Sequence, residues 1–231
     1  GGDPVRAQTF LADDLAALYA VIGALAALRH SERTGEGQHV DTAMLDTMIA
    51  GSSGLVALAA AGAPPHRWGN ETAFIVPSNL YRTLDGQVYI SIALNAHWRR
   101  LCDVMGRPDL ARAQGFSRNE ERLENRWAVD QLVAGWCATQ TADAAESILS
   151  RAGIVAAKVR SMTEVAEDPH VRIREMLVEI PLHNGQVAPL PGVVPKFSRT
   201  PTKIRRPAPA AGADSDQVQQ IDGRAAWPQI R

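Results

Sequence analysis

The stretch "FLADDLAALYAVIGALAALRH" (residues 10–30) places two adjacent carboxylates, Asp13 and Asp14, at the head of an apolar run. Residues 15–28 contain no charged side chain. Because small apolar residues lie on every side of this segment, it predicts a helix over 13–30 that is buried all round. The run is shorter than the roughly 20 apolar residues that span a bilayer, so no membrane association is expected. Two acids at the start of such a helix either cap its N-terminus or take part in catalysis.

The overall composition excludes several classes of partner. The 231 residues contain 24 Lys and Arg against 25 Asp and Glu, which provides no electrostatic footprint for nucleic acid or an anionic membrane. The two cysteines, Cys102 and Cys137, lie beside bulky apolar residues and have no zinc-ligand spacing. This pattern is typical of a reduced, cytoplasmic protein without a metal. No signal peptide is expected. The sequence starts at Gly1 and not at Met, so the chain is interpreted as a fragment, a processed product or a natural short subunit.

The segments that follow predict alternating strand and helix and then a linker. "HVDTAM" predicts a strand over 39–44, and the small-residue segment that follows predicts one helix over 45–62. Proline and glycine mark a linker over 62–78. Two strands then flank the turn at Asp85-Gly86, which is a strong hairpin signal.

The middle of the chain predicts a compact α+β domain over 76–161. Apolar residues at helical spacing predict helices over 95–106, 125–140 and 141–153, the last with Thr141 as its N-cap. A short strand over 154–161 completes the domain. After it the sequence predicts a connector.

The connector continues into a segment, 181–209, that we call the basic strap. Seven of the fourteen prolines fall in it, and no acidic residue occurs between Glu179 and Asp214. This composition predicts an extended, proline-stiffened segment. Its positive charge is either solvated on the surface or turned toward an anionic ligand such as a nucleotide phosphate.

The order of motifs resembles a known family. The succession "GGDPVRAQTFLADDLAALYAVIGALAALRHSERTGEGQHVDTAMLD", "NLYRTLDGQVYISIALNAHWRRLCDVMGRPDL", "LSRAGIVAAKVRSMTEVAEDP" and "VPKFSRTP" is similar to the class III CoA-transferases. That family includes formyl-CoA transferase, carnitine CoA-transferase and the α-methylacyl-CoA racemases. The resemblance covers nearly all of the 231 residues.

The resemblance implies an α/β fold in which a Rossmann-like large domain carries an inserted small α+β domain, in an interlocked dimer. Family chains are longer, so the first strands and most CoA-nucleotide contacts would lie upstream of Gly1. The chain is therefore expected to form a homodimer or a complex with a chain that carries the N-terminal half. The implied division is large domain 1–62, linker 63–75, small domain 76–161, return connector 162–199 and C-terminal return to the large domain 200–231.

The resemblance also assigns a nucleophile. The family's catalytic aspartate lies ten residues before the glycine of its "IG" pair, and counting back from Gly23 reaches Asp13. The positive end of a helix favours an ionised carboxylate, which is the form that attacks a thioester. The alternative is that Asp13 only caps the helix. Asp14 is expected to be a cap or a neighbouring polar group.

Two reactions occur in this family, and Asn95 favours one of them. Racemases have an acidic residue where this sequence has Asn95, and an amide cannot exchange a proton at neutral pH. Asn95 can instead orient an acid or stabilise an oxyanion. CoA transfer between carboxylic acids is therefore favoured over epimerisation of an acyl-CoA. A non-catalytic or truncated subunit, which binds a chain that supplies the missing N-terminal half, is a third hypothesis.

Three further residues are weaker candidates for substrate binding. His97 begins the helix after the predicted sheet, and Arg67 and Asn70 belong to a linker motif near the domain junction. Acyl-CoA and a carboxylic acid are the implied substrates. The resemblance implies no tightly bound cofactor and no metal.

Overall fold

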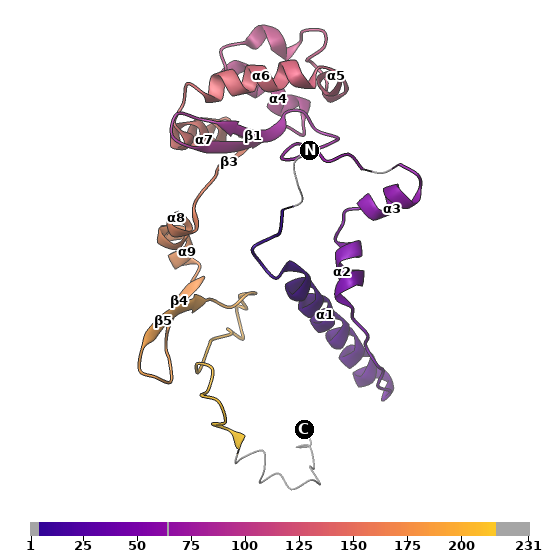
Figure 1. The fold of residues 1–231 in the computed structure, drawn as a ribbon, viewed down its shortest axis with the longest axis vertical. Helices are drawn as coiled ribbons and strands as arrows, with labels where there is room; N and C mark the ends of the chain where they lie inside the picture. Colours follow the sequence, from indigo (N-terminus) through magenta and orange to yellow (C-terminus); the bar gives the residue numbers. More distant parts are fainter. Residues whose placement is uncertain (1–4, 64, 216–231) are drawn as a thin grey trace. The chain divides into compact units, whose positions relative to one another are not determined.

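A computed structural model of the chain describes residues 5–63 and 65–215, and the statements below refer to these residues (Figure 1). The chain divides into two compact units at the boundary between Lys158 and Val159. It is a mixed α/β structure, with a three-stranded sheet in the first unit and a two-stranded sheet in the second.

The first unit begins with three helices, which are α1 (Leu11–Thr34), α2 (Met44–Ala50) and α3 (Leu55–Ala60). Helix α1 begins two residues before the predicted helix over 13–30 and ends four residues after it, with Gly35 as its C-cap. Gly35 has a φ of 79°, and its N–H donates to the carbonyl of Ser31 at 2.8 Å. Glycine adopts this left-handed conformation at little cost.

The predicted helix over 45–62 is wrong as a single helix. Residues 51–54 form a turn between α2 and α3, in which Ser53 and Gly54 have φ of 53° and 83°. Because positive φ cannot continue a right-handed helix, the segment splits at this turn.

The predicted strand over 39–44 is also wrong. Strands need a neighbour to pair with, and no strand among the described residues pairs with this segment. It runs instead against α1, where a Cβ added to Gly23 would lie 2.7 Å from Val40 Cγ1. Glycine at this position lets Val40 approach the helix backbone.

The expectation that helix 13–30 is buried all round is wrong for the chain by itself. No residue of α1 is buried, and apolar side chains such as Ile22 and Leu25 are about 60% exposed (62% and 61%). The helix has 24 residues, so the length argument against a membrane span was wrong too. With a mean hydropathy of 1.8, α1 is long and apolar enough to cross a membrane. Core helices of soluble proteins can have the same length and composition.

The sheet of the first unit is antiparallel, in the order β1 (Ser78–Arg82), β2 (Gln87–Ser91) and β3 (Val155–Lys158). Tyr81 pairs with Val88, and Ile90 pairs with Ala156. The predicted hairpin and the strand that follows the last predicted helix are therefore confirmed.

Helices cover one face of this sheet. Helix α6 packs on β1, and α7 packs on β2 and β3. The predicted helices over 95–106, 125–140 and 141–153 are confirmed as α4, α6 and α7, whereas η1 and α5 were not predicted. The bounds are α4 (Asn95–Val104), η1 (Pro108–Ala111), α5 (Asn119–Glu124), α6 (Arg126–Cys137) and α7 (Ala142–Arg151). The buried apolar residues of the described chain all lie between Val76 and Ile154, so the core belongs to this region.

The start of α7 shows how the hairpin and a helix are joined. Thr141 is the N-cap as predicted, and its side chain accepts from the N–H of Ala144 at 3.2 Å. The hairpin turn supplies a second acceptor, because Asp85 Oδ1 accepts from the N–H of Ala142 at 2.7 Å. Two of the unpaired N–H groups at the helix start are thereby satisfied.

The second unit contains regular structure that the sequence reading missed. Its elements are α8 (Met162–Glu167), α9 (Pro169–Ile173), β4 (Leu177–Pro181) and β5 (Val187–Pro191). The two strands form an antiparallel hairpin around Asn184-Gly185. The prediction of one extended segment for the basic strap is therefore wrong at its start, where the chain folds back through the end of β4, the turn and β5.

The prolines of this hairpin avoid the hydrogen-bonding positions. Leu182 donates to Gln186, and Gly192 donates to Met176, which fixes the hydrogen-bonded pairs of the ladder. Pro181, Pro189 and Pro191 fall between those pairs, where a backbone N–H would point away from the partner strand. A two-stranded sheet can hold prolines there without losing a ladder bond.

Candidate functional site

Asp13 lies in the first turn of α1 and is exposed. The N-cap of this helix is Phe10, and no side chain donates to or accepts from its cap. Among the described residues, the Asp13 carboxylate has no hydrogen-bond or ion-pair partner. The capping alternative for Asp13 is therefore not observed, whereas both Asp13 and Asp14 lie where the helix dipole favours negative charge.

Asn95 and His97 both lie in the first turn of α4. The Oδ1 atom of Asn95 accepts a hydrogen bond from Arg122 Nη2 at 3.2 Å. The Nδ1 atom of His97 is buried and has no hydrogen-bond partner within the described ranges. Because these residues stand two apart on one helix, their side chains point in different directions.

Arg67 and Asn70 are exposed residues of the segment that leads to the sheet. Their neighbours anchor this segment to α6. Arg126 forms an ion pair with Glu71 at 3.0 Å, and its guanidinium carbon lies 4.6 Å from the centre of the Trp68 ring. Sequence reading missed Arg126, because its partners lie more than fifty residues earlier in the chain.

The structure does not join these candidates into one constellation. Asn95 and His97 share α4, Arg67 and Asn70 share the segment before β1, and Asp13 belongs to α1. No hydrogen bond or ion pair in the described chain links Asp13 to Asn95.

Two buried polar groups near the sheet were not predicted. Arg122 is fully buried, and burial lowers its pKa to about 10. Tyr81 donates a hydrogen bond to the Asp130 carboxylate, and burial raises the pKa of both groups above their ordinary values. The signal in the sequence was only that Asp130 occurs within an apolar helical pattern, whereas Arg122 lies in the charged stretch 118–126.

The cysteine thiols are unsuited to nucleophilic roles. Cys102 and Cys137 are both buried, and burial raises the pKa of each thiol to about 12. The thiolate is the reactive form, so neither residue is activated at neutral pH.

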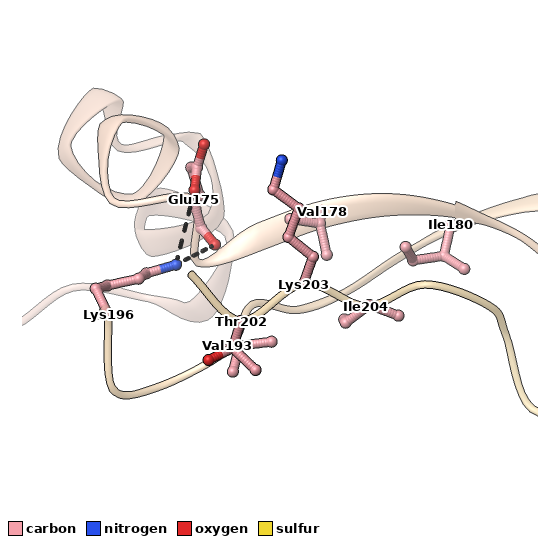
Figure 2. A pocket seen from close by; sticks show the side chains of 8 residues that line it. All are labelled: Glu175, Val178, Ile180, Val193, Lys196, Thr202, Lys203 and Ile204. Carbon is pink, nitrogen blue, oxygen red and sulfur yellow. Dashed lines mark hydrogen bonds and ion pairs between the residues drawn. The ribbon is translucent and has the colours of Figure 1, made fainter. Parts of the chain in front are cut away.

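The basic strap lines a cavity of about 290 Å³ in the second unit (Figure 2). Figure 2 shows the Lys196 amine turned toward Glu175; it lies 3.4 Å from the Glu175 carbonyl oxygen and 3.9 Å from a carboxylate oxygen. Lys203 and the apolar side chains of Val178 and Ile180 also line it. Because Glu175 partly neutralises Lys196, this cavity offers less positive charge to an anion than the sequence suggested.

The described residues contain no group of three or more His, Cys, Asp or Glu side chains that could hold a metal ion.

Comparison with known proteins decides the family. The family model for CoA-transferase family III matches residues 1–215. The chain belongs to CoA-transferase family III. The resemblance noted from the motifs is thereby confirmed, and the α/β fold agrees with it.

Curated family III relatives include enzymes with named substrates. A succinyl-CoA–L-malate CoA-transferase beta subunit from Chloroflexus aurantiacus is 35% identical over 94% of this chain and 55% of its own length. A succinyl-CoA:mesaconate CoA-transferase from Haloarcula hispanica is 34% identical over 78% of this chain and 45% of its own length. The chain spans about half the length of the curated relatives it matches.

Solved structures agree on the fold. The protein Rv3272 from Mycobacterium tuberculosis matches with a TM-score of 0.81 and 23% identity, over 93% of this chain and 57% of the other. A CAIB/BAIF family protein from Brucella suis matches with a TM-score of 0.74 and 26% identity, over 95% of this chain and 57% of the other. In each case the matched region is 57% of the solved chain.

Proposed function

We propose that this chain is part of an enzyme that transfers coenzyme A between carboxylic acids, with Asp13 as the nucleophile. The observation that supports this most directly is the position of Asp13, ten residues before Gly23, in a chain of CoA-transferase family III. The carboxylate is exposed in the first turn of α1, where an ionised acid is favoured.

The reaction proceeds in four balanced steps. The Asp13 carboxylate attacks the thioester carbonyl of the donor acyl-CoA, the carbon–sulfur bond breaks, and a mixed anhydride and the CoA thiolate form. The thiolate then attacks the aspartyl carbonyl and releases the donor acid, which leaves an aspartyl-CoA thioester. The acceptor carboxylate attacks this thioester, its carbon–sulfur bond breaks, and a second anhydride and the CoA thiolate form. The thiolate then attacks the acceptor acyl carbonyl of that anhydride, and its bond to the Asp13 carboxylate oxygen breaks. The new acyl-CoA and free Asp13 are released.

The covalent route suits this chemistry because a carboxylate is a weak nucleophile and the thioester energy must be kept from water. Asn95 donates a hydrogen bond to the acid or to the oxyanion, with Arg67, Asn70 and His97 as weaker substrate contacts. Succinyl-CoA is the first donor to test, because the curated relatives include enzymes that are named for succinyl-CoA or succinate. We place the enzyme in the cytoplasm.

We propose that 1–62 and 200–231 belong to a Rossmann-like large domain, that 76–161 form the inserted small domain, and that 63–75 and 162–199 connect them. The CoA nucleotide would then be held by a polypeptide that corresponds to the unmatched half of the relatives. Residues 216–231 lie outside the described residues, so that part of the assignment rests on sequence alone.

The decisive variant is Asp13→Asn in the enzyme that contains this chain. It removes the nucleophile while preserving the size of the side chain, so we expect CoA transfer from succinyl-CoA to fall below detection, with folding and CoA binding retained. Asp14→Asn is the matched control and should keep more than half of the activity. Normal transfer by Asp13→Asn, or equal losses in both variants, would contradict the assignment.

A further inference from the structure

Arg122, on α5, is a buried cation with neutral partners. Its guanidinium donates to the carbonyl oxygens of Val76 at 2.7 Å and Phe116 at 3.0 Å, and to Asn95 Oδ1 at 3.2 Å. It also lies over the Trp98 ring, 5.1 Å from the ring centre. Within residues 5–63 and 65–215, no carboxylate forms an ion pair with it.

The contact with Asn95 fixes the orientation of its side-chain amide. A guanidinium carries only donors, so the atom of Asn95 that faces it must be the oxygen. The NH₂ group of Asn95 is then directed away from Arg122. Asn95 is exposed, so its two N–H donors are available to a bound molecule at the start of α4.

The same arginine holds the surrounding backbone. Asn119, one turn earlier on α5, accepts from the N–H of Val76 at 3.1 Å, and Arg122 binds the carbonyl of that residue. The Arg122 side chain thus forms hydrogen bonds both to the segment before β1 and to the start of α4. A buried, multiply bonded guanidinium is a rigid support, because moving it would leave several polar groups unpaired.

We propose that Arg122 is a positioning residue, which turns the amide of Asn95 so that its N–H donors meet the carboxylate or acyl oxygen of the bound acid. The inference rests on the proposed CoA transfer. It also explains why an amide suits position 95. A carboxylate there would pair with the buried cation more strongly, but it would offer no donor and would repel the acid substrate.

Asn95→Asp separates stability from function. The change keeps the oxygen that faces Arg122 and supplies a charge partner, so the melting temperature should equal or exceed that of the parent enzyme. Activity should move the opposite way, with kcat/KM for the acceptor acid falling at least tenfold. Asn184→Asp, in the exposed β4–β5 turn, is the matched control for an added charge and should change neither quantity.

Arg122→Lys tests the positioning itself. Lysine keeps the charge but cannot reach three acceptors at once, so the loss in kcat/KM should match that of Asn95→Ala. The double variant Arg122→Lys with Asn95→Ala should lose no more kcat/KM than either single variant does. Losses that multiply would overturn the proposal. If Arg122→Lys fails to fold, the two Asn95→Asp measurements decide the question.

The outcomes distinguish this inference from the proposed function. Parent-level transfer by Asn95→Asp, with Asp13→Asn inactive, would overturn only the inference. An enzyme whose Asp13→Asn variant still transfers CoA would overturn the nucleophile assignment. The melting temperature still tests the contact in that case, because a clear destabilisation by Asn95→Asp would show that Asn95 does not face Arg122 through its oxygen.

Discussion

The buried Tyr81 hydroxyl and the partly buried Asp130 carboxylate form a hydrogen-bonded pair between β1 and α6. Burial raises the pKa of Asp130, and the hydrogen bond from Tyr81 opposes that rise. A carboxyl with a raised pKa in the folded state favours folding most when it is protonated. Its contribution to stability therefore declines as the pH rises from the ordinary value of 3.8 through the raised value.

Removing the hydroxyl should reveal this linkage. Tyr81→Phe leaves the partly buried carboxylate without that donor, so the free energy of unfolding should fall by about 1–3 kcal/mol at pH 8. The loss should be smaller near pH 4, because the protonated acid needs the donor less. Urea unfolding at the two pH values measures both quantities. Ser150→Ala, which removes an exposed hydroxyl from α7, is the control and should change stability by less than about 0.5 kcal/mol. An equal loss at both pH values would contradict the account.

Elements that depend on local signals could be predicted from the sequence. The hairpin at Asp85-Gly86, the amphipathic helix α4 and the cap at Thr141 all appear where expected. Asn184-Gly185 between alternating residues carried the same kind of hairpin signal, but the density of prolines obscured it. The hairpin prolines fall where no ladder bond is needed, which the sequence alone does not reveal.

Elements that depend on distant partners could not be predicted. The segment 39–44 alternates like a strand but has no partner strand among the described residues. The position of Asp13 followed from its spacing to Gly23 and the family resemblance. The support of Asn95 by Arg122 could not be predicted, because these residues are 27 positions apart and the arginine looked like part of a charged helix face. Contacts of that range are decided by the folded chain.

At the scale of the whole molecule, α1 is an apolar helix that no other part of the described chain buries. No residue of α1 is buried, although apolar residues dominate it. The matched relatives are nearly twice as long as the matched region, since the Chloroflexus beta subunit is covered over 55% of its length. We infer that α1 is a core helix covered by a second copy or by the polypeptide that corresponds to the unmatched half.

This inference predicts association in solution. Exposed apolar surface of this size is unfavourable in water, so light scattering at micromolar concentration should show a dimer or a complex with the chain that carries the other half. Flotation with phospholipid vesicles is the companion measurement and should leave the protein in the aqueous fractions. A stable monomer, or quantitative binding to vesicles, would contradict the assignment of α1 as a covered core helix.

The most direct test of the central claim is to trap the covalent intermediate. The active enzyme is incubated with succinyl-CoA and hydroxylamine, which converts an aspartyl-CoA thioester or an aspartyl anhydride into a hydroxamate. The account predicts that tandem mass spectrometry of the peptide containing "FLADDLAALY" places the modification on Asp13 and leaves Asp14 unmodified, and that omitting succinyl-CoA abolishes it. A modification on Asp14 or on another residue, or rapid CoA transfer with no trapped hydroxamate, would contradict it.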